Sequence, residues 1–62
     1  MASYRVKGTA RWPDKHPSAG STEWEGIYNA TSDVEAASLG VEATRAAWKD
    51  AIEVTATEVV LT

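Results

Sequence analysis

The sequence predicts an α+β fold of the type β-β-α-β, a three-stranded antiparallel sheet with one helix packed on one of its faces. Three observations predict it: two stretches of polar-apolar alternation in the first half of the chain, a helix-capping signal followed by helical spacing, and a third alternating stretch near the end. A chain of 62 residues forms one domain at most. We therefore expect a single domain spanning residues 1–62.

The first half of the chain predicts a hairpin. From Tyr4 to Trp12, apolar residues and glycine alternate with basic residues and threonine, as in a half-buried strand. The segment from Pro13 to Ser21 has two prolines, a glycine and no apolar anchor, so we expect a long hairpin loop there. A second alternation follows, in which one face carries Thr22, Trp24, Gly26, Tyr28 and Ala30.

A helix is predicted after the second strand. Ser32 and Glu35 have the spacing of a capping box, in which the serine accepts from the third amide and the glutamate reaches back. Helical spacing then continues from about Asp33 to Lys49. Gly40 is compatible with an early C-cap, but we prefer one continuous helix in which this glycine packs tightly on the sheet.

The last strand is predicted from Ile52 to Leu61. Its alternation changes phase near Glu58, which indicates a β-bulge. After this point residues 59–61 are all large and aliphatic, so they place apolar side chains on both faces of the strand.

Charge predicts the strand order. A right-handed crossover through the helix leaves the second and third strands parallel to each other and the first antiparallel to both. On the face away from the helix, the first strand carries Arg5, Lys7 and Arg11, and the other two strands carry Glu23, Glu25 and Glu53. Because opposite charges on adjacent strands stabilise a sheet, the basic strand belongs in the centre, which gives the order 2-1-3.

The predicted core is small. Apolar residues make up 44% of the chain, but eleven residues are alanine. The side chains expected to be buried between sheet and helix are Tyr4, Val6, Trp24, Tyr28, Val54 and Ala43. Because the chain has no cysteine to form a disulfide or a thiolate metal site, extra stability has to come from self-association or from close packing of small residues.

Composition and motifs exclude several functions. The net charge of −3 argues against binding nucleic acid or an anionic membrane through bulk charge. No apolar run approaches the roughly 18 residues of a membrane span, and the first residues lack the apolar core of a signal peptide, which favours a cytoplasmic protein. No catalytic triad, phosphate loop or metal-ligand spacing is present, and His16 has no positioned partner. We expect no enzymatic activity, no cofactor and no metal.

The excess of apolar residues predicts an interaction surface. Ile27 interrupts the polar face of its strand, and Val59, Val60 and Leu61 lie on a strand expected at the edge of the sheet. An interface formed by these four residues is the favoured interpretation. We expect the chain to form a homodimer by pairing of third strands across a two-fold axis, and to bind an unknown host protein. The alternative is that the C-terminus folds over its own core.

A nucleic-acid-binding module is the alternative function. Arg5, Lys7 and Arg11 form a basic row on the first strand, near Trp12 and Trp24. Single-stranded nucleic acid binds where cations and exposed aromatic rings share a surface. Alternation places these tryptophans on the opposite face from the basic row, which makes nucleic acid the less favoured partner.

The stretch from Tyr28 to Ala36, Tyr-Asn-Ala-Thr-Ser-Asp-Val-Glu-Ala, resembles the strand-to-helix junction of short β-β-α-β proteins such as archaeal ribosomal protein LX. The LX type carries basic RNA-contacting residues where this chain has Glu53 and Glu58. The whole chain is more similar to small accessory proteins of actinobacterial phages, some of which bind host proteins and are toxic. That resemblance implies a non-enzymatic protein-binding module that acts on a host protein in the host cytoplasm.

Overall fold

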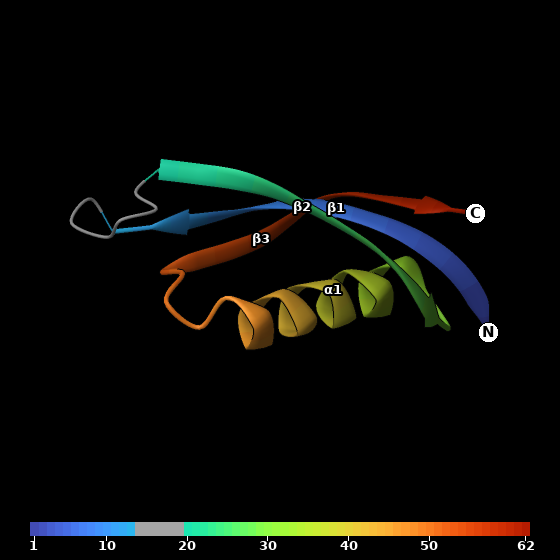
Figure 1. Cartoon of the computed structure of the whole chain (residues 1–62). Coiled ribbons are helices and arrows are strands. Elements are labelled where there is room, and N and C mark those ends of the chain that lie inside the picture. Colours follow the sequence, from blue (N-terminus) through green and yellow to red (C-terminus); the bar gives the residue numbers. More distant parts are fainter. Residues whose placement is uncertain (14–19) are drawn as a thin grey trace.

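A computed structural model describes residues 1–13 and 20–62 of the protein. Its elements in chain order are β1 (Ala2–Trp12), β2 (Gly20–Ala30), α1 (Asp33–Ala47) and β3 (Glu53–Leu61). The strands form one antiparallel sheet in the order β2-β1-β3, and α1 lies across one face of it (Figure 1). The predicted fold class and strand order are therefore confirmed. Most of the loop predicted from Pro13 to Ser21, including His16, lies outside the described residues, and Gly20 and Ser21 already belong to β2.

The two strand pairings differ in regularity. β1 pairs with β2 without interruption, from Ala2 opposite Ala30 to Trp12 opposite Gly20. The pairing of β1 with β3 shifts between Lys7 and Gly8, because Lys7 lies opposite Glu58 whereas Gly8 lies opposite Ala56. Thr57 is thus an extra residue in β3, which confirms the β-bulge predicted near Glu58.

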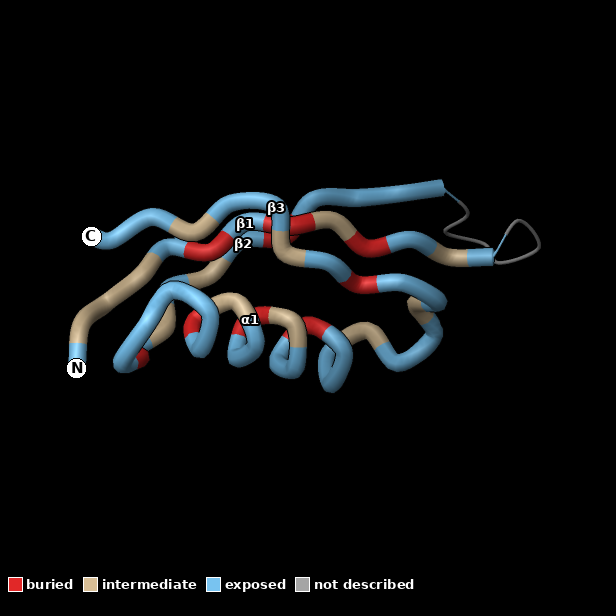
Figure 2. The backbone as a smooth tube through the Cα atoms, turned by 180° about the vertical axis from the view of Figure 1, so that it is seen from behind, coloured by how far each residue is buried: buried red, intermediate tan, exposed pale blue. Residues whose placement is uncertain are grey.

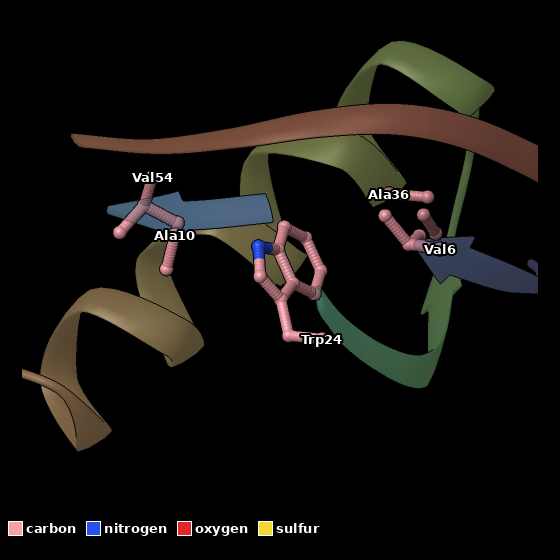
Figure 3. Close-up of a cluster of buried hydrophobic side chains, with 6 residues drawn as sticks. Val6, Ala10, Trp24, Ala36 and Val54 are labelled. Carbon is pink, nitrogen blue, oxygen red and sulfur yellow. The ribbon is translucent and has the colours of Figure 1, made fainter. Parts of the chain in front are cut away.

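The core is built around Trp24. Its ring lies between Val6 and Ala36 on one side and Ala10 and Val54 on the other (Figure 3). The indole nitrogen of Trp24 donates a hydrogen bond to the carbonyl oxygen of Thr9 at 3.2 Å, so the polar atom of this buried ring has a partner.

Two glycines make room for this ring. A Cβ atom on Gly40 would lie 2.9 Å from the Trp24 ring, and one on Gly8 would collide both with the ring and with the carbonyl oxygen of Thr55. Gly40 lies inside α1 and is buried, so the prediction of one continuous helix packed closely at this glycine is confirmed.

The start of α1 follows its capping signal. The Ser32 hydroxyl accepts a hydrogen bond from the amide of Glu35 at 3.1 Å. The Glu35 carboxylate reaches back one residue beyond the cap, where it accepts from the amide and hydroxyl of Thr31. The helix ends at Ala47, two residues before the predicted Lys49, and Trp48 is its C-cap.

The predicted core is only partly correct. Val6, Trp24 and Val54 are buried as expected, but Tyr4 and Tyr28 are half-buried.

The prediction for Ala43 is wrong, because its side chain is exposed. The buried stripe of α1 consists of Ala36, Gly40 and Thr44, which repeat every fourth residue, and Ala43 lies about 100° around the helix from Thr44. The Thr44 hydroxyl donates to the carbonyl oxygen of Gly40 at 2.8 Å, so this polar group is buried with its hydrogen bond satisfied.

Burial is confined to the layer between sheet and helix (Figure 2). The outer side of α1 is exposed, and so are most residues on the other face of the sheet, here called the open face. Several large apolar side chains stay exposed: Met1, Ile27, Val34, Leu39, Ile52, Val60 and Leu61. Within the described ranges no helix is both long enough and apolar enough to cross a membrane.

Candidate functional site

The open face of the sheet carries its side chains in rows that cross all three strands. Residues opposite each other in antiparallel strands point to the same face. Arg5 lies opposite Ile27 of β2 and Val60 of β3, and we call these three residues the terminal row. Lys7 lies opposite Glu25 and Glu58, and we call these three residues the charged row. The termini lie at the end of the sheet away from the end of β1 and the start of β2 (Figure 1).

The cation of the charged row, Lys7, is paired within the chain. The Lys7 ammonium lies 3.7 Å from a carboxylate oxygen of Glu25 and 3.9 Å from one of Glu58. Further towards the hairpin connection, the Arg11 guanidinium lies 3.9 Å from the Glu53 carboxylate. These side chains are about half exposed, so each pair adds little stability, but together the pairs occupy both cations of this part of the face, Lys7 and Arg11.

The terminal row is built differently. Arg5 has an aliphatic side chain on each side, and Ile27 is 66% exposed while Val60 is 38% exposed. In the described part of the chain the ion pairs involve Lys7 and Arg11 but not Arg5. The row therefore presents one arginine without a carboxylate partner between two exposed aliphatic side chains.

The four residues predicted at an interface divide into two groups. Ile27 and Val60 lie on the open face. Val59 and Leu61 lie on the helix side of β3, where Val59 packs half-buried against the core and Leu61 remains 61% exposed. The alternative expectation, a C-terminus that covers its own core, thus describes Val59, whereas Val60 and Leu61 remain available for contacts with another chain.

The basic row predicted for nucleic acid does share one exposed face. Arg5, Lys7 and Arg11 all lie on the open face. The aromatic rings do not, because Trp24 is buried in the core and Trp12 packs on Trp48 with ring centroids 5.3 Å apart. Cations and stacking surfaces therefore lie on opposite sides of the sheet.

The described part of the chain offers no side-chain cluster for a metal ion. Among residues 1–13 and 20–62, no group of three or more histidine, cysteine, aspartate or glutamate side chains could hold a metal ion. Four carboxylates have structural contacts: Glu35 holds the start of α1, and Glu25, Glu53 and Glu58 pair with basic residues of β1.

The sequence interpretation missed that Ile27 and Val60 lie beside Arg5. A signal for it was present in the phase change near Glu58. Counting residues through a one-residue bulge puts Glu58 beside Lys7 and Val60 beside Arg5 on the open face.

No protein-family model, curated protein or solved structure matches the chain.

Proposed function

We propose that the chain is a non-enzymatic protein-binding module that binds its partner through the terminal row. The observation that carries the proposal is Arg5, which lies between the exposed side chains of Ile27 and Val60 and has no carboxylate partner among the described residues. Arginine is enriched among the residues that dominate binding energy, and the centres of interfaces are otherwise poor in charge. The terminal row has this composition, and the charged row does not.

The chemistry of the terminal row defines the partner surface. It has to cover Ile27 and Val60 with apolar side chains and to place a carboxylate where Arg5 can reach it. A guanidinium binds a carboxylate through two parallel hydrogen bonds, which fixes orientation as well as adding affinity. The resemblance to accessory proteins of actinobacterial phages is the reason to look for this partner first among the proteins of an actinobacterial host.

The test compares two variants of the same strand and face. Val60→Asp places a carboxylate in the terminal row, whereas Thr55→Asp places one at an exposed position two rows away, opposite Thr9. A protein captured from host lysate and then purified should bind the unmodified chain and Thr55→Asp equally, and should bind Val60→Asp at least about tenfold more weakly. Equal binding by all three chains would contradict the proposed surface.

A nucleic-acid-binding module is the second candidate, and only Arg5 supports it, because Lys7 and Arg11 already have carboxylate partners. Binding of single-stranded DNA at low salt that disappears when Arg5, Lys7 and Arg11 are all replaced by alanine would favour this candidate. Retention of a host protein by the same triple variant would contradict the terminal row as the protein-binding surface.

A further inference from the structure

The outer edge of β3 lies near the terminal row and is a second candidate interaction surface. β3 has β1 on one side and no strand on the other within the described chain. The bulge at Thr57 divides this edge into two segments, 53–56 and 58–61. Unpaired edges attract other strands, and a bulge limits how far such pairing can extend. An added strand therefore has to pair with one short segment or the other.

The second segment is the one suited to pairing. Its side chains after Glu58 are aliphatic, and Val60 and Leu61 are among the exposed large apolar residues of the chain. In the first segment the large apolar side chain, Val54, is already buried in the core. Pairing at the second segment therefore covers apolar surface that pairing at the first would leave exposed to water.

Two residues of this segment, Val59 and Leu61, have backbone N–H and C=O groups that are available to an added strand. The amide of Thr62 donates to the carbonyl oxygen of Ser3 at 2.9 Å. In an antiparallel pair, residues that bond to the partner strand alternate with residues that do not. The backbone N–H and C=O groups of Val60, like those of Thr62, therefore point towards β1. The same groups of Val59 and Leu61 point away from β1 and from the sheet.

We propose that a second copy of the chain occupies this edge, with the two β3 strands antiparallel across a two-fold axis that passes beside Val60. Val59 then lies opposite Leu61 of the partner subunit, and their outward N–H and C=O groups bond to each other. Val60 lies opposite Val60 of the partner subunit on the open face. The inference deepens the proposed function and rests on it for the role of the terminal row.

Charge and the bulge favour this register over two others that symmetry allows. An axis beside Glu58 would put two identical carboxylates opposite each other, which destabilises a strand pair. An axis beside Val59 would put Glu58 opposite an aliphatic side chain and draw the bulged Thr57 into the pairing. With the axis beside Val60, Glu58 lies opposite Thr62 of the partner subunit, and every aliphatic residue of the segment faces another.

The dimer changes the surface offered to a partner protein. Val60 of one chain meets Val60 of the partner subunit, so the two terminal rows join into one strip with an arginine on each side of its centre. Leu61, which is 61% exposed in the single chain, is covered by Val59 of the partner subunit. The proposed binding surface is thus doubled and two-fold symmetric.

Single cysteines test the register on the purified chain, which has no cysteine of its own. Directly opposed residues in a pair that lacks hydrogen bonds have Cα atoms about 4.5 Å apart, within the range that a disulfide spans. Under mild oxidation, Val60→Cys should form a covalent dimer in high yield, whereas Glu58→Cys and Thr55→Cys should not. Rapid cross-linking of Glu58→Cys, or equal yields for all three variants, would overturn the register.

Sedimentation tests the association itself. The unmodified chain should be a dimer at about 100 µM, and Val60→Lys should raise the dissociation constant about tenfold or more while Thr55→Lys leaves it unchanged. Circular dichroism of Val60→Lys checks that the variant is folded. An unmodified chain that is monomeric at this concentration would overturn the dimer, and the proposed function would still stand if that monomer bound its partner through the terminal row. A dimer that binds no other protein would support the pairing and contradict the proposed function.

Discussion

The terminal row and the charged row lie side by side on the same face, yet they differ in whether their central cation has a carboxylate neighbour. Each has a cation of β1 at its centre, Arg5 in one and Lys7 in the other. Lys7 has a carboxylate on both sides, whereas Arg5 has an aliphatic side chain on both sides. The cation of the charged row is paired within the described chain, and the cation of the terminal row is not. The neighbours across the sheet thus decide whether a cation is paired within the chain or is free to bind another one.

The bulge in β3 decides which residues of β3 join the two rows. If the pairing of Ala56 with Gly8 continued without an extra residue, Glu58 would lie opposite Val6 on the helix face. Val6 is fully buried, so an unpaired carboxylate at that place would be costly. Thr57 as an extra residue returns Glu58 to the open face beside Lys7 and allows Val59 to pack on the core.

The largest expected effect is unfolding of the chain, which removes both rows together. Trp24→Ala removes the ring at the centre of the core and should cost about 3–5 kcal/mol, whereas a domain of this size has only about 5 kcal/mol in total. Urea denaturation followed by circular dichroism should show a chain that is largely unfolded in water. The control is Ile27→Ala at an exposed position, expected to change stability by less than about 0.5 kcal/mol. A Trp24→Ala variant as stable as this control would contradict the core described above.

The second prediction concerns a substitution that adds a carboxylate to the terminal row. Ile27→Glu places a carboxylate opposite Arg5, which reproduces the arrangement of Glu25 opposite Lys7. The free energy of unfolding should change by less than about 1 kcal/mol, since exposed ion pairs contribute little. Binding of the partner protein, measured by calorimetry, should weaken about tenfold or more because Arg5 is then occupied. Undiminished binding would show that the free cation of the terminal row is not what the partner recognises.

The third prediction separates the terminal row from the stability of that end of the molecule. Ser32 caps α1 at the end where the termini lie, but its contacts are on the helix side of the sheet. Ser32→Ala should lower the free energy of unfolding by about 0.5–2 kcal/mol, because the amide of Glu35 loses its acceptor. Ser38→Ala, at an exposed position inside the helix, is the control and should cost nothing. Partner binding of the folded Ser32→Ala variant should be unchanged, and a parallel loss of binding would link the surface to the helix.

The smallest expected effect comes from comparing the two cations directly. Lys7→Gln removes the partner of two half-exposed glutamates and should cost less than about 1 kcal/mol, with the loss shrinking as salt is added. Arg5→Gln should leave thermal stability unchanged at every salt concentration but weaken binding of the partner. If the two substitutions gave the same melting temperatures and the same salt dependence, the distinction between the rows would fail.

Much of the fold could be predicted from sequence because its signals are local or depend on simple alternation. Strand parity placed Arg5 and Lys7 away from the helix and Val6 towards it, as the structure does. Serine at position 32 with glutamate three residues later predicted the start of α1. Charge complementarity between strands predicted β1 at the centre, and the ion pairs of Lys7 and Arg11 follow from it.

Gly40 on the sheet could be predicted from sequence, but tertiary structure alone decided that Thr44 rather than Ala43 joins it there, and which side chains surround Arg5. The Trp24 ring needs the space that Gly40 leaves, so α1 turns Gly40 and Thr44 inward and leaves Ala43 in solvent, although alanine is the more apolar choice. The neighbours of Arg5 depend on the register of two other strands, which is set by long-range pairing and by a bulge. A side chain's own sequence context contains neither, and for that reason the sequence by itself determined the faces of the sheet but not the terminal row on one of them.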